Sequence, residues 1–297
     1  MLSELQYIDQ GFSAFFSSVI FIFGALIGSF INVCIYRIPE GKSIIFPGST
    51  CSCGQPIKWF DNIPILSWFS LRGKARCCKA SYSFRYPFVE LLTACLFLTA
   101  WQQQPHAKAL CLMVLVALLI CATFIDFDHM EIPDRFSIGT GVVGVILSGI
   151  MPSLHGISDP TFAYASVKGI FEALVGLMIG SGLILWIALI AEKVLRQEAM
   201  GFGDVKLLGG IGAFLGWQGA VFALFGGAVI GTVGVLGWTV AKAVVPALRP
   251  KESGEGEDLI GREMPFAPML ASGALLYAIV FETQVDEYIA LIQELAQ

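Results

Sequence analysis

The segment QGFSAFFSSVIFIFGALIGSFINVCIY, residues 10–36, decides the fold class because it contains no charged residue over 27 positions. An apolar stretch of about 18 or more residues is long enough to cross the hydrocarbon core of a bilayer as a helix. The segment lacks the basic start and the small-residue cleavage site of a signal peptide, so we expect it to be retained. The sequence therefore begins with a predicted transmembrane helix.

The composition of the whole chain agrees with a membrane protein. Of its 297 residues, 56% are hydrophobic and only 14% are charged, whereas soluble proteins carry about 25% charged residues. The 32 glycines suit helices that pack closely in lipid. The net charge of -5 gives no indication of a nucleic-acid partner, and none is expected.

Further runs without charge extend this pattern along the chain. They are residues 91–107, 109–125, 136–158, 173–191, 207–241 and 264–281. The run 207–241 is 35 residues long, too long for one helix, and GWQG at residues 216–219 predicts a break that splits it. We therefore predict an all-α polytopic membrane protein with about eight transmembrane helices. Seven is the alternative, because the run 91–107 is weakly apolar.

Lysine and arginine indicate which side of the membrane the loops face. Residues 37–87 hold eight basic residues, whereas residues 1–10 hold Glu4 and Asp9 and no base. Cytoplasmic loops carry an excess of lysine and arginine, which places residues 37–87 in the cytoplasm. With eight spans, the segments on the same side are 126–135, 192–206 and 242–263, and both termini lie on the opposite side.

This topology predicts a division of the chain into three parts. Residues 1–37 form the first transmembrane helix, residues 38–87 a cytoplasmic loop domain, and residues 88–297 a multi-helix membrane domain. At about 50 residues the loop domain is small for an independent hydrophobic core. We expect a metal ion, or docking to the membrane domain, to stabilise it.

The loop domain contains two close pairs of cysteines, Cys51 with Cys53 and Cys77 with Cys78. Two pairs about 25 residues apart suggest a tetrahedral zinc site, and a disulfide is not favoured in a reducing cytoplasm. The spacings CxC and CC depart from the usual CxxC, and adjacent cysteine side chains are expected to diverge. Two alternatives therefore stay open, a zinc site of shifted geometry and no metal.

Acidic residues at predicted helix ends carry the strongest chemical signal. Asp126 and Asp128 lie in IDFDHMEIPD, residues 125–134, and Asp204 ends GFGD, residues 201–204. Two carboxylates a few ångströms apart share one proton, so one can take a proton from water while the other polarises a peptide carbonyl. That is aspartyl-protease chemistry. The alternative is that these residues are helix caps. Asp126 and Asp128 are two positions apart, so only one of them can face a common partner on a helix.

Taken together, these motifs resemble bacterial type IV prepilin peptidases, the bifunctional leader peptidases and N-methyltransferases of the GXGD aspartyl protease group. The similarity extends from residue 24 to about residue 276. In chain order it rests on GSFINV (28–33), YRIP (36–39), DNIPILSW (61–68), LRGK (71–74), RYP (85–87) with Glu90, the two acidic motifs, and PFAP (265–268).

The resemblance implies that Asp126 and Asp204 are the catalytic pair, with Asp128 as the fallback for Asp126 and Asp134 as structural. It implies a multi-pass enzyme of the bacterial inner membrane whose active site faces the cytoplasm. Its substrates would be type IV prepilins or type II secretion pseudopilins, cleaved after a glycine at the end of a basic leader. The new terminal amine would then be methylated with S-adenosylmethionine. Thr50 and Ala75 stand where the family carries cysteines.

Two other functions compete with this interpretation. A transporter could use the acidic residues to relay protons, but the sequence shows no internal repeat. A non-catalytic subunit of a secretion system would not need GFGD together with the distant acidic motif. The resemblance implies that the contacts to S-adenosylmethionine lie within residues 37–90, although no glycine-rich cofactor fingerprint is present there to name them.

Overall fold

The computed structural model describes residues 11–196, 200–244 and 265–295. The first ten residues and most of the predicted loop 242–263, both used above to assign the orientation, lie outside the described residues. The chain folds into two compact units. The first comprises Met1–Ile125 and Ile146–Ile170, and the second comprises Asp126–Val145 and Phe171–Gln297. The division into residues 1–37, 38–87 and 88–297 stays a prediction.

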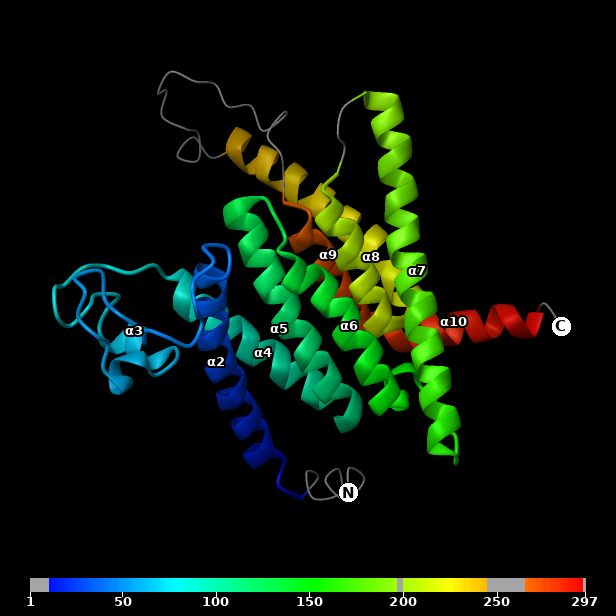
Figure 1. The fold of residues 1–297 in the computed structure, drawn as a ribbon, viewed down its shortest axis with the longest axis horizontal. Coiled ribbons are helices and arrows are strands. Elements are labelled where there is room, and N and C mark those ends of the chain that lie inside the picture. The colour runs from blue at the N-terminus through cyan, green and yellow to red at the C-terminus, as the bar shows by residue number, and fades with distance from the viewer. Residues whose placement is uncertain (1–10, 197–199, 245–264, 296–297) are drawn as a thin grey trace. The chain divides into compact units, whose positions relative to one another are not determined.

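The first unit is built on two helices that lie side by side, α2 (Ser13–Arg37) and α4 (Arg85–Gln103) (Figure 1). They touch backbone to backbone, because a Cβ added at Gly24 or at Gly28 would lie only 2.7 Å from a Cα atom of α4. One turn further along α2, the Asn32 side chain donates a 3.1 Å hydrogen bond to the carbonyl oxygen of Tyr86. Small residues that let helix backbones approach are typical of packing within lipid.

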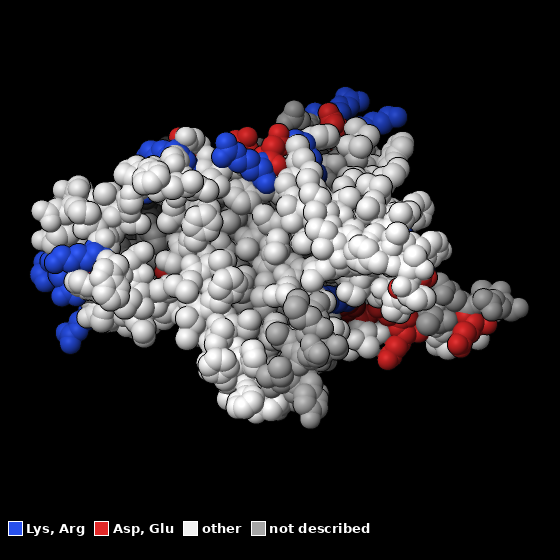
Figure 2. All heavy atoms as spheres, turned by 60° about the horizontal axis from the view of Figure 1, so that its bottom comes forward, with Lys and Arg blue, Asp and Glu red and all other residues white. Residues whose placement is uncertain are grey.

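Between α2 and α4 the chain forms a loop with little regular structure. It contains the 3-10 turn η1 (Trp59–Asn62), the short helix α3 (Leu66–Ser70) and two isolated β-bridges. Trp68 makes two contacts that hold the loop together. Its indole packs edge-to-face against the ring of Phe84, with the ring centroids 5.2 Å apart, and its N–H donates a hydrogen bond to the carbonyl of Tyr82. Figure 2 shows basic side chains gathered over this loop, and the exposed ones are Lys42, Lys58, Arg72, Lys74, Arg76 and Lys79.

The longer helices follow the loop. Helices α5 (His106–His129), α6 (Asp134–Ile150) and α7 (Phe162–Leu195) each run from one unit into the other, and the 3-10 turn η2 (Pro152–His155) belongs to the first. The second unit continues with α8 (Phe202–Val244), α9 (Ala267–Leu276), the π-helical turn η4 (Tyr277–Phe281) and α10 (Glu282–Leu295). Helices α8 and α9 lie side by side (Figure 1).

In the second unit, α7 and α8 meet without intervening side chains. A Cβ on Gly176 or on Gly212 would overlap the carbonyl oxygen of the other. Helix α8 breaks at Gly216, whose φ of 72° and ψ of 179° interrupt the helical ladder. The break predicted at GWQG is therefore confirmed. Glycine adopts such a positive φ without steric cost, which explains why the interruption occurs at this residue.

The chain is an all-α polytopic membrane protein. Within the described residues, five helical stretches are long and apolar enough to span a membrane, namely Ser13–Arg37, His106–His129, Phe162–Leu195, Phe202–Ala241 and Ala267–Ile289. Each charge-free run falls largely on a helix, but α4 and α6 are not among these five. The number of eight spans stays a prediction.

The charge-free runs do not coincide with the helix boundaries. In the run 136–158, α6 ends at Ile150 and Pro152 starts the separate turn η2, which Gly156 closes at φ 69°. The run 173–191 is only part of α7, which begins at Phe162 and includes Lys168 and Glu172. Long charged side chains near a helix end can extend toward water, so a charge marks the membrane boundary better than it marks the end of a helix.

Candidate active site and cysteine cluster

Asp126 lies one turn before the end of α5 and is 5% exposed. Its Oδ2 accepts a 3.0 Å hydrogen bond from the backbone N–H of Ala267 and a further bond from that of Phe266. These two amides open α9, within the PFAP motif. A helix N-terminus offers unpaired N–H groups and favours negative charge. Asp126 therefore does cap a helix, but it caps α9 rather than its own.

Asp204 is the third residue of α8 and is 9% exposed. Its carboxylate is close enough to that of Asp126 for the two charges to interact. Its Oδ1 is buried and has no hydrogen-bond partner within the described residues. A buried polar oxygen without a partner is costly, and at this position it is available to a water molecule or a substrate. Both aspartates belong to the second unit.

Glycine permits the approach that brings the two acidic motifs together. A Cβ on Gly203 would lie 3.2 Å from the Cβ of Ile132, tighter than an ordinary contact, so the start of α8 can press against the segment after α5. Lys206, one turn into α8, forms an ion pair with Asp134 at the start of α6, in which Nζ and Oδ1 are 2.6 Å apart. Asp134 thus has an ion-pair partner on α8, and its purely structural role stays a prediction.

Asp128 differs from Asp126 in its surroundings. Asp126 is buried beside Asp204, whereas Asp128, two residues later on the same helix, is exposed. This is the divergence expected for side chains two positions apart. The geometry of the described residues therefore favours Asp126 over Asp128 as the partner of Asp204.

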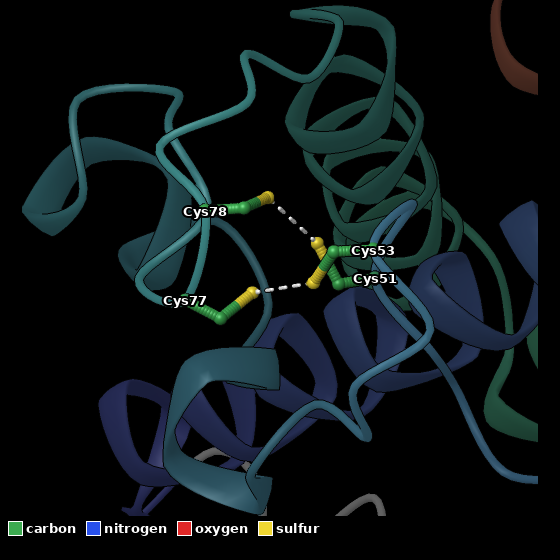
Figure 3. A group of neighbouring side chains, drawn as sticks. All are labelled: Cys51, Cys53, Cys77 and Cys78. Atoms are coloured by element: carbon green, nitrogen blue, oxygen red, sulfur yellow. Dashed lines mark hydrogen bonds between the residues drawn. The ribbon is translucent and has the colours of Figure 1, made fainter.

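The four loop cysteines come together. Their sulfur atoms all lie within 4.8 Å of one another, with Cys51 to Cys78 at 3.5 Å and Cys53 to Cys77 at 3.4 Å (Figure 3). Zinc–sulfur bonds of about 2.3 Å in a tetrahedron place sulfurs about 3.8 Å apart, so the four thiols fit a zinc ion. The expectation that the side chains of Cys77 and Cys78 diverge was wrong.

Two short turns produce this convergence. Cys51 and Cys53 lie on a turn closed by the hydrogen bond from the Cys51 N–H to Gln55, with Gly54 at φ 82°. Cys77 and Cys78 lie on a turn closed by the bond from the Ala75 N–H to Ala80. Each turn reverses the chain, so both members of each pair point to the same space.

The thiols also influence one another's protonation. Hydrogen bonds from the backbone N–H of Cys53 and from the thiols of Cys77 and Cys78 lower the pKa of Cys51 to about 6. The pKa of Cys77 is raised to about 12, because its thiol is hydrogen-bonded to Cys51 and to Cys53. The lowered pKa of Cys51 favours its thiolate, which is the form that binds metal ions.

Glu90 is the remaining buried acid of the motifs. It is 9% exposed on α4, and its Oε2 accepts a 2.6 Å hydrogen bond from the backbone N–H of Ile65 in the loop. The neighbouring Arg85 donates a 3.0 Å bond to the carbonyl of Phe124 and lies 4.9 Å from the ring of the same residue. Sequence reasoning did not find the contact to Ile65, because no local pattern connects residues 25 positions apart.

Comparison with known proteins matches the chain to two family models in succession. The bacterial peptidase A24 N-terminal domain matches residues 22–104, and the type IV leader peptidase family matches residues 113–236. A prepilin leader peptidase/N-methyltransferase of Aeromonas salmonicida is 33% identical over 260 residues, which cover 78% of this chain and 84% of that relative. The chain belongs to the type IV leader peptidase family. The cysteine cluster and Glu90 lie in the first matched segment of this family, and Asp126 and Asp204 lie in the second.

Other members of the type IV leader peptidase family match over different lengths. A prepilin leader peptidase/N-methyltransferase of Pectobacterium carotovorum subsp. carotovorum is 31% identical over 305 residues, covering 94% of this chain and 98% of the relative. One of Myxococcus xanthus is 34% identical over 231 residues, covering 76% of this chain and 65% of the relative. No solved structure matches the chain.

Proposed function

We propose that this chain cleaves the leader peptide of type IV prepilins and then methylates the new N-terminus, with Asp126 and Asp204 as the catalytic pair of the cleavage. The relatives named above carry these two activities in their names. The observation that supports the pair best is the buried, unpaired Oδ1 of Asp204 beside the carboxylate of Asp126.

The two aspartates have different surroundings and therefore different roles in the proposed cleavage. Two backbone N–H groups stabilise negative charge on Asp126. Asp126 accepts a proton from the attacking water, and Asp204 carries the shared proton and donates a hydrogen bond to the scissile carbonyl. The water oxygen bonds to the carbonyl carbon, the carbon–nitrogen bond breaks, and the proton passes to the leaving amine.

The position of the pair suits a substrate that is itself a membrane helix. Asp126 lies near the end of α5 and Asp204 near the start of α8, both helices that are apolar and long enough to span a membrane. The excess of lysine and arginine in the loop 37–87 supports a position of these helix ends at the cytoplasmic face of the inner membrane. A prepilin or pseudopilin whose apolar helix lies in the bilayer would present its leader junction at that depth, where cleavage after glycine would occur.

Methyl transfer is proposed for the first unit, in the loop and its flanking helices. The freed amine attacks the methyl carbon of S-adenosylmethionine, the sulfur–methyl bond breaks, and S-adenosylhomocysteine leaves as the amine releases a proton. The described residues do not single out contacts for this co-substrate. Cys51, Cys53, Cys77 and Cys78 would hold a structural zinc ion, whose bonds to sulfur would stabilise a loop with little hydrophobic core.

A cleavage assay tests the proposal. Purified wild type, Asp126→Asn, Asp128→Asn and Asp204→Asn are incubated in detergent with a prepilin and S-adenosylmethionine, and mass spectrometry follows leader loss and methylation together. We expect Asp126→Asn and Asp204→Asn to lose cleavage by about a thousandfold or more, and Asp128→Asn to retain at least part of it. All variants should insert into membranes as the wild type does.

The same assay separates the rival functions. A proton-relaying transporter or a non-catalytic subunit would not cleave a prepilin, whichever aspartate is present. If Asp204→Asn still cleaves at the wild-type rate, the aspartyl mechanism is wrong.

A further inference from the structure

Glu90 is a buried carboxylate that the proposed cleavage does not use. Its Oε2 accepts the 2.6 Å hydrogen bond from the Ile65 N–H, and the side chain of Ser29 on α2 lies close enough to favour the charged form of the same carboxylate. Next to it, Gly28 of α2 approaches the Cα of Glu90 so closely that a Cβ there would lie at 2.7 Å. Glu90 thus connects three parts of the first unit, α2, α4 and the loop.

The loop residue that Glu90 contacts has an unusual backbone. Ile65 has φ 63° and ψ −56°, and the N–H of Leu66 donates a 2.6 Å bond to the carbonyl of Pro64, which closes a γ-turn. This form of γ-turn is rare, and a positive φ is strained for a β-branched residue. Such a conformation persists only where surrounding contacts hold it. The hydrogen bond to Glu90 is made by the amide of the strained residue itself.

The turn formed by Asn62, Ile63, Pro64 and Ile65 is here called the NIPI turn. The residue that directly precedes it, Asp61, also makes contacts that hold it in place. Asp61 accepts three hydrogen-bond contacts from the Arg76 guanidinium, at 2.7, 3.0 and 3.0 Å. Arg76 directly precedes Cys77. A continuous series of contacts therefore runs from the cysteine cluster through Arg76 and the NIPI turn to Glu90, whose Cα packs against Gly28 of α2.

We propose that Glu90 is a positioning residue that holds the NIPI turn against α2 and α4 in the geometry that methyl transfer requires. This inference rests on the proposed function, in which the first unit carries methylation and the pair Asp126 and Asp204 carries cleavage. The contacts of Glu90 described here lie within the first unit, whereas both aspartates belong to the second. Loss of the Glu90 carboxylate therefore lowers methylation and leaves cleavage.

Three variants of the full chain test this separation. Glu90→Ala removes the acceptor for the Ile65 N–H, and Glu90→Gln keeps one carbonyl oxygen that can accept it. Glu40→Ala is the matched control, because Glu40 is an exposed glutamate in the loop that contains the NIPI turn, and it pairs only with the nearby Lys42 in the contacts named here. Each is assayed twice, with an intact prepilin for cleavage and with a pre-cleaved pilin and S-adenosylmethionine for methylation.

We expect Glu90→Ala to lower the methylation rate by about tenfold or more, the effect of losing a hydrogen bond to a charged group. Its cleavage rate should stay within about twofold of wild type. Glu90→Gln should retain most of the methylation, and Glu40→Ala should change neither rate. Hydrogen exchange of peptides that contain the NIPI turn should be faster in Glu90→Ala and close to wild type in Glu90→Gln.

A second substitution distinguishes positioning from simple space filling. Glycine adopts a positive φ readily, so Ile65→Gly should restore part of the methylation when combined with Glu90→Ala. A residue that only fills space would give no such rescue. If Glu90→Ala fails to fold, Glu90→Asp tests the positioning role instead. Its shorter side chain keeps the charge but moves the oxygen away from the Ile65 N–H. It should lower methylation and spare cleavage.

Two results would overturn the inference. One is methylation at the wild-type rate in Glu90→Ala, or in Glu90→Asp if only that variant folds. The other is an equal loss of cleavage and methylation. If the wild-type protein itself neither cleaves nor methylates, the proposed function fails instead, so the two failures are distinguishable.

Discussion

The loop between α2 and α4 and the helices of the second unit hold their functional groups by different means. In the second unit, main-chain contacts predominate: Gly176 packs against Gly212 between two helices, and the backbone amide of Ala267 donates a hydrogen bond to Asp126. In the loop, side-chain contacts predominate, namely those among four thiols and the ion pair between Arg76 and Asp61. Main-chain contacts are lost when bulk is added, whereas side-chain contacts are lost when a group is removed. The two regions should therefore fail separately and for opposite reasons.

The largest expected effect comes from removing thiols. Cys51→Ser combined with Cys78→Ser eliminates two of the four proposed zinc ligands, one from each turn. Structural zinc contributes about 10 kcal/mol or more in small zinc-binding peptides, so we expect the loop to lose its zinc and become sensitive to protease. Methylation should fall with it, and cleavage should change less.

Metal analysis by mass spectrometry of the purified protein checks this expectation. Cys111→Ser provides the control, because Cys111 is a buried cysteine of α5 and not part of the cluster. Wild type without zinc would remove the metal from the proposal. Cleavage that falls as far as methylation would show that the regions do not fail separately.

The opposite test adds a single methyl group to the second unit. Gly212→Ala would place its Cβ against the main chain of Gly176, where no side chain can move aside. Overpacking of this kind costs up to about 3 kcal/mol, so the apparent Tm in detergent should fall by roughly 6 to 12 °C. Cleavage should be lost at a correspondingly lower temperature, because the second unit unfolds there.

Gly234→Ala is the matched control on the same helix, because nothing lies within 4 Å of a Cβ at Gly234. Alanine favours the helical state over glycine by about 1 kcal/mol, so this variant should be neutral or slightly stabilised. Equal Tm values for Gly212→Ala and Gly234→Ala would contradict the close approach of α7 and α8.

The sequence predicted well what depends on local pattern. Apolar runs located the helices because charge is costly in lipid, and GWQG located the break at Gly216 because only glycine adopts that φ at no cost. The apolar runs alone do not give the helix ends, because apolar composition continues past Ile150 while Pro152 starts a separate turn. Composition reports the environment of a segment and not its hydrogen bonding.

Contacts between distant residues were only partly accessible. The grouping of Asp126 with Asp204 came from the chemistry of paired carboxylates and from family resemblance, since 78 residues separate them. The hydrogen bond from Ala267 to Asp126 spans 141 positions, and no periodicity encodes it. The convergence of Cys77 and Cys78 was missed, because the closing bond between Ala75 and Ala80 sets their direction.

An ion pair in each region gives a finer comparison. In the second unit Lys206 pairs with Asp134 at 2.6 Å and lies 5.4 Å from the ring of Phe202. Exposed pairs contribute up to about 1 kcal/mol, so Lys206→Met should lower Tm by about 2 to 4 °C and cleavage by less than about fivefold. A double-mutant cycle with Asp134→Asn should show coupling between the two residues. Complete loss of cleavage would instead indicate a direct catalytic role for Lys206.

The pair in the loop should show the smallest effect, and its pH dependence has a definite sign. Hydrogen bonds from the Arg76 guanidinium hold the pKa of Asp61 below its ordinary value. A carboxyl whose pKa is lowered by folding adds stability above its unfolded pKa and loses it as the pH falls through the folded pKa. Arg76→Gln should therefore raise the pKa of Asp61 toward about 3.9, as an NMR titration of labelled aspartate would show, and should weaken the loop at neutral pH but not in strong acid. An unchanged Asp61 pKa would mean that solvent screens this pair completely. Side-chain contacts would then hold the loop only at the thiols and at Glu90.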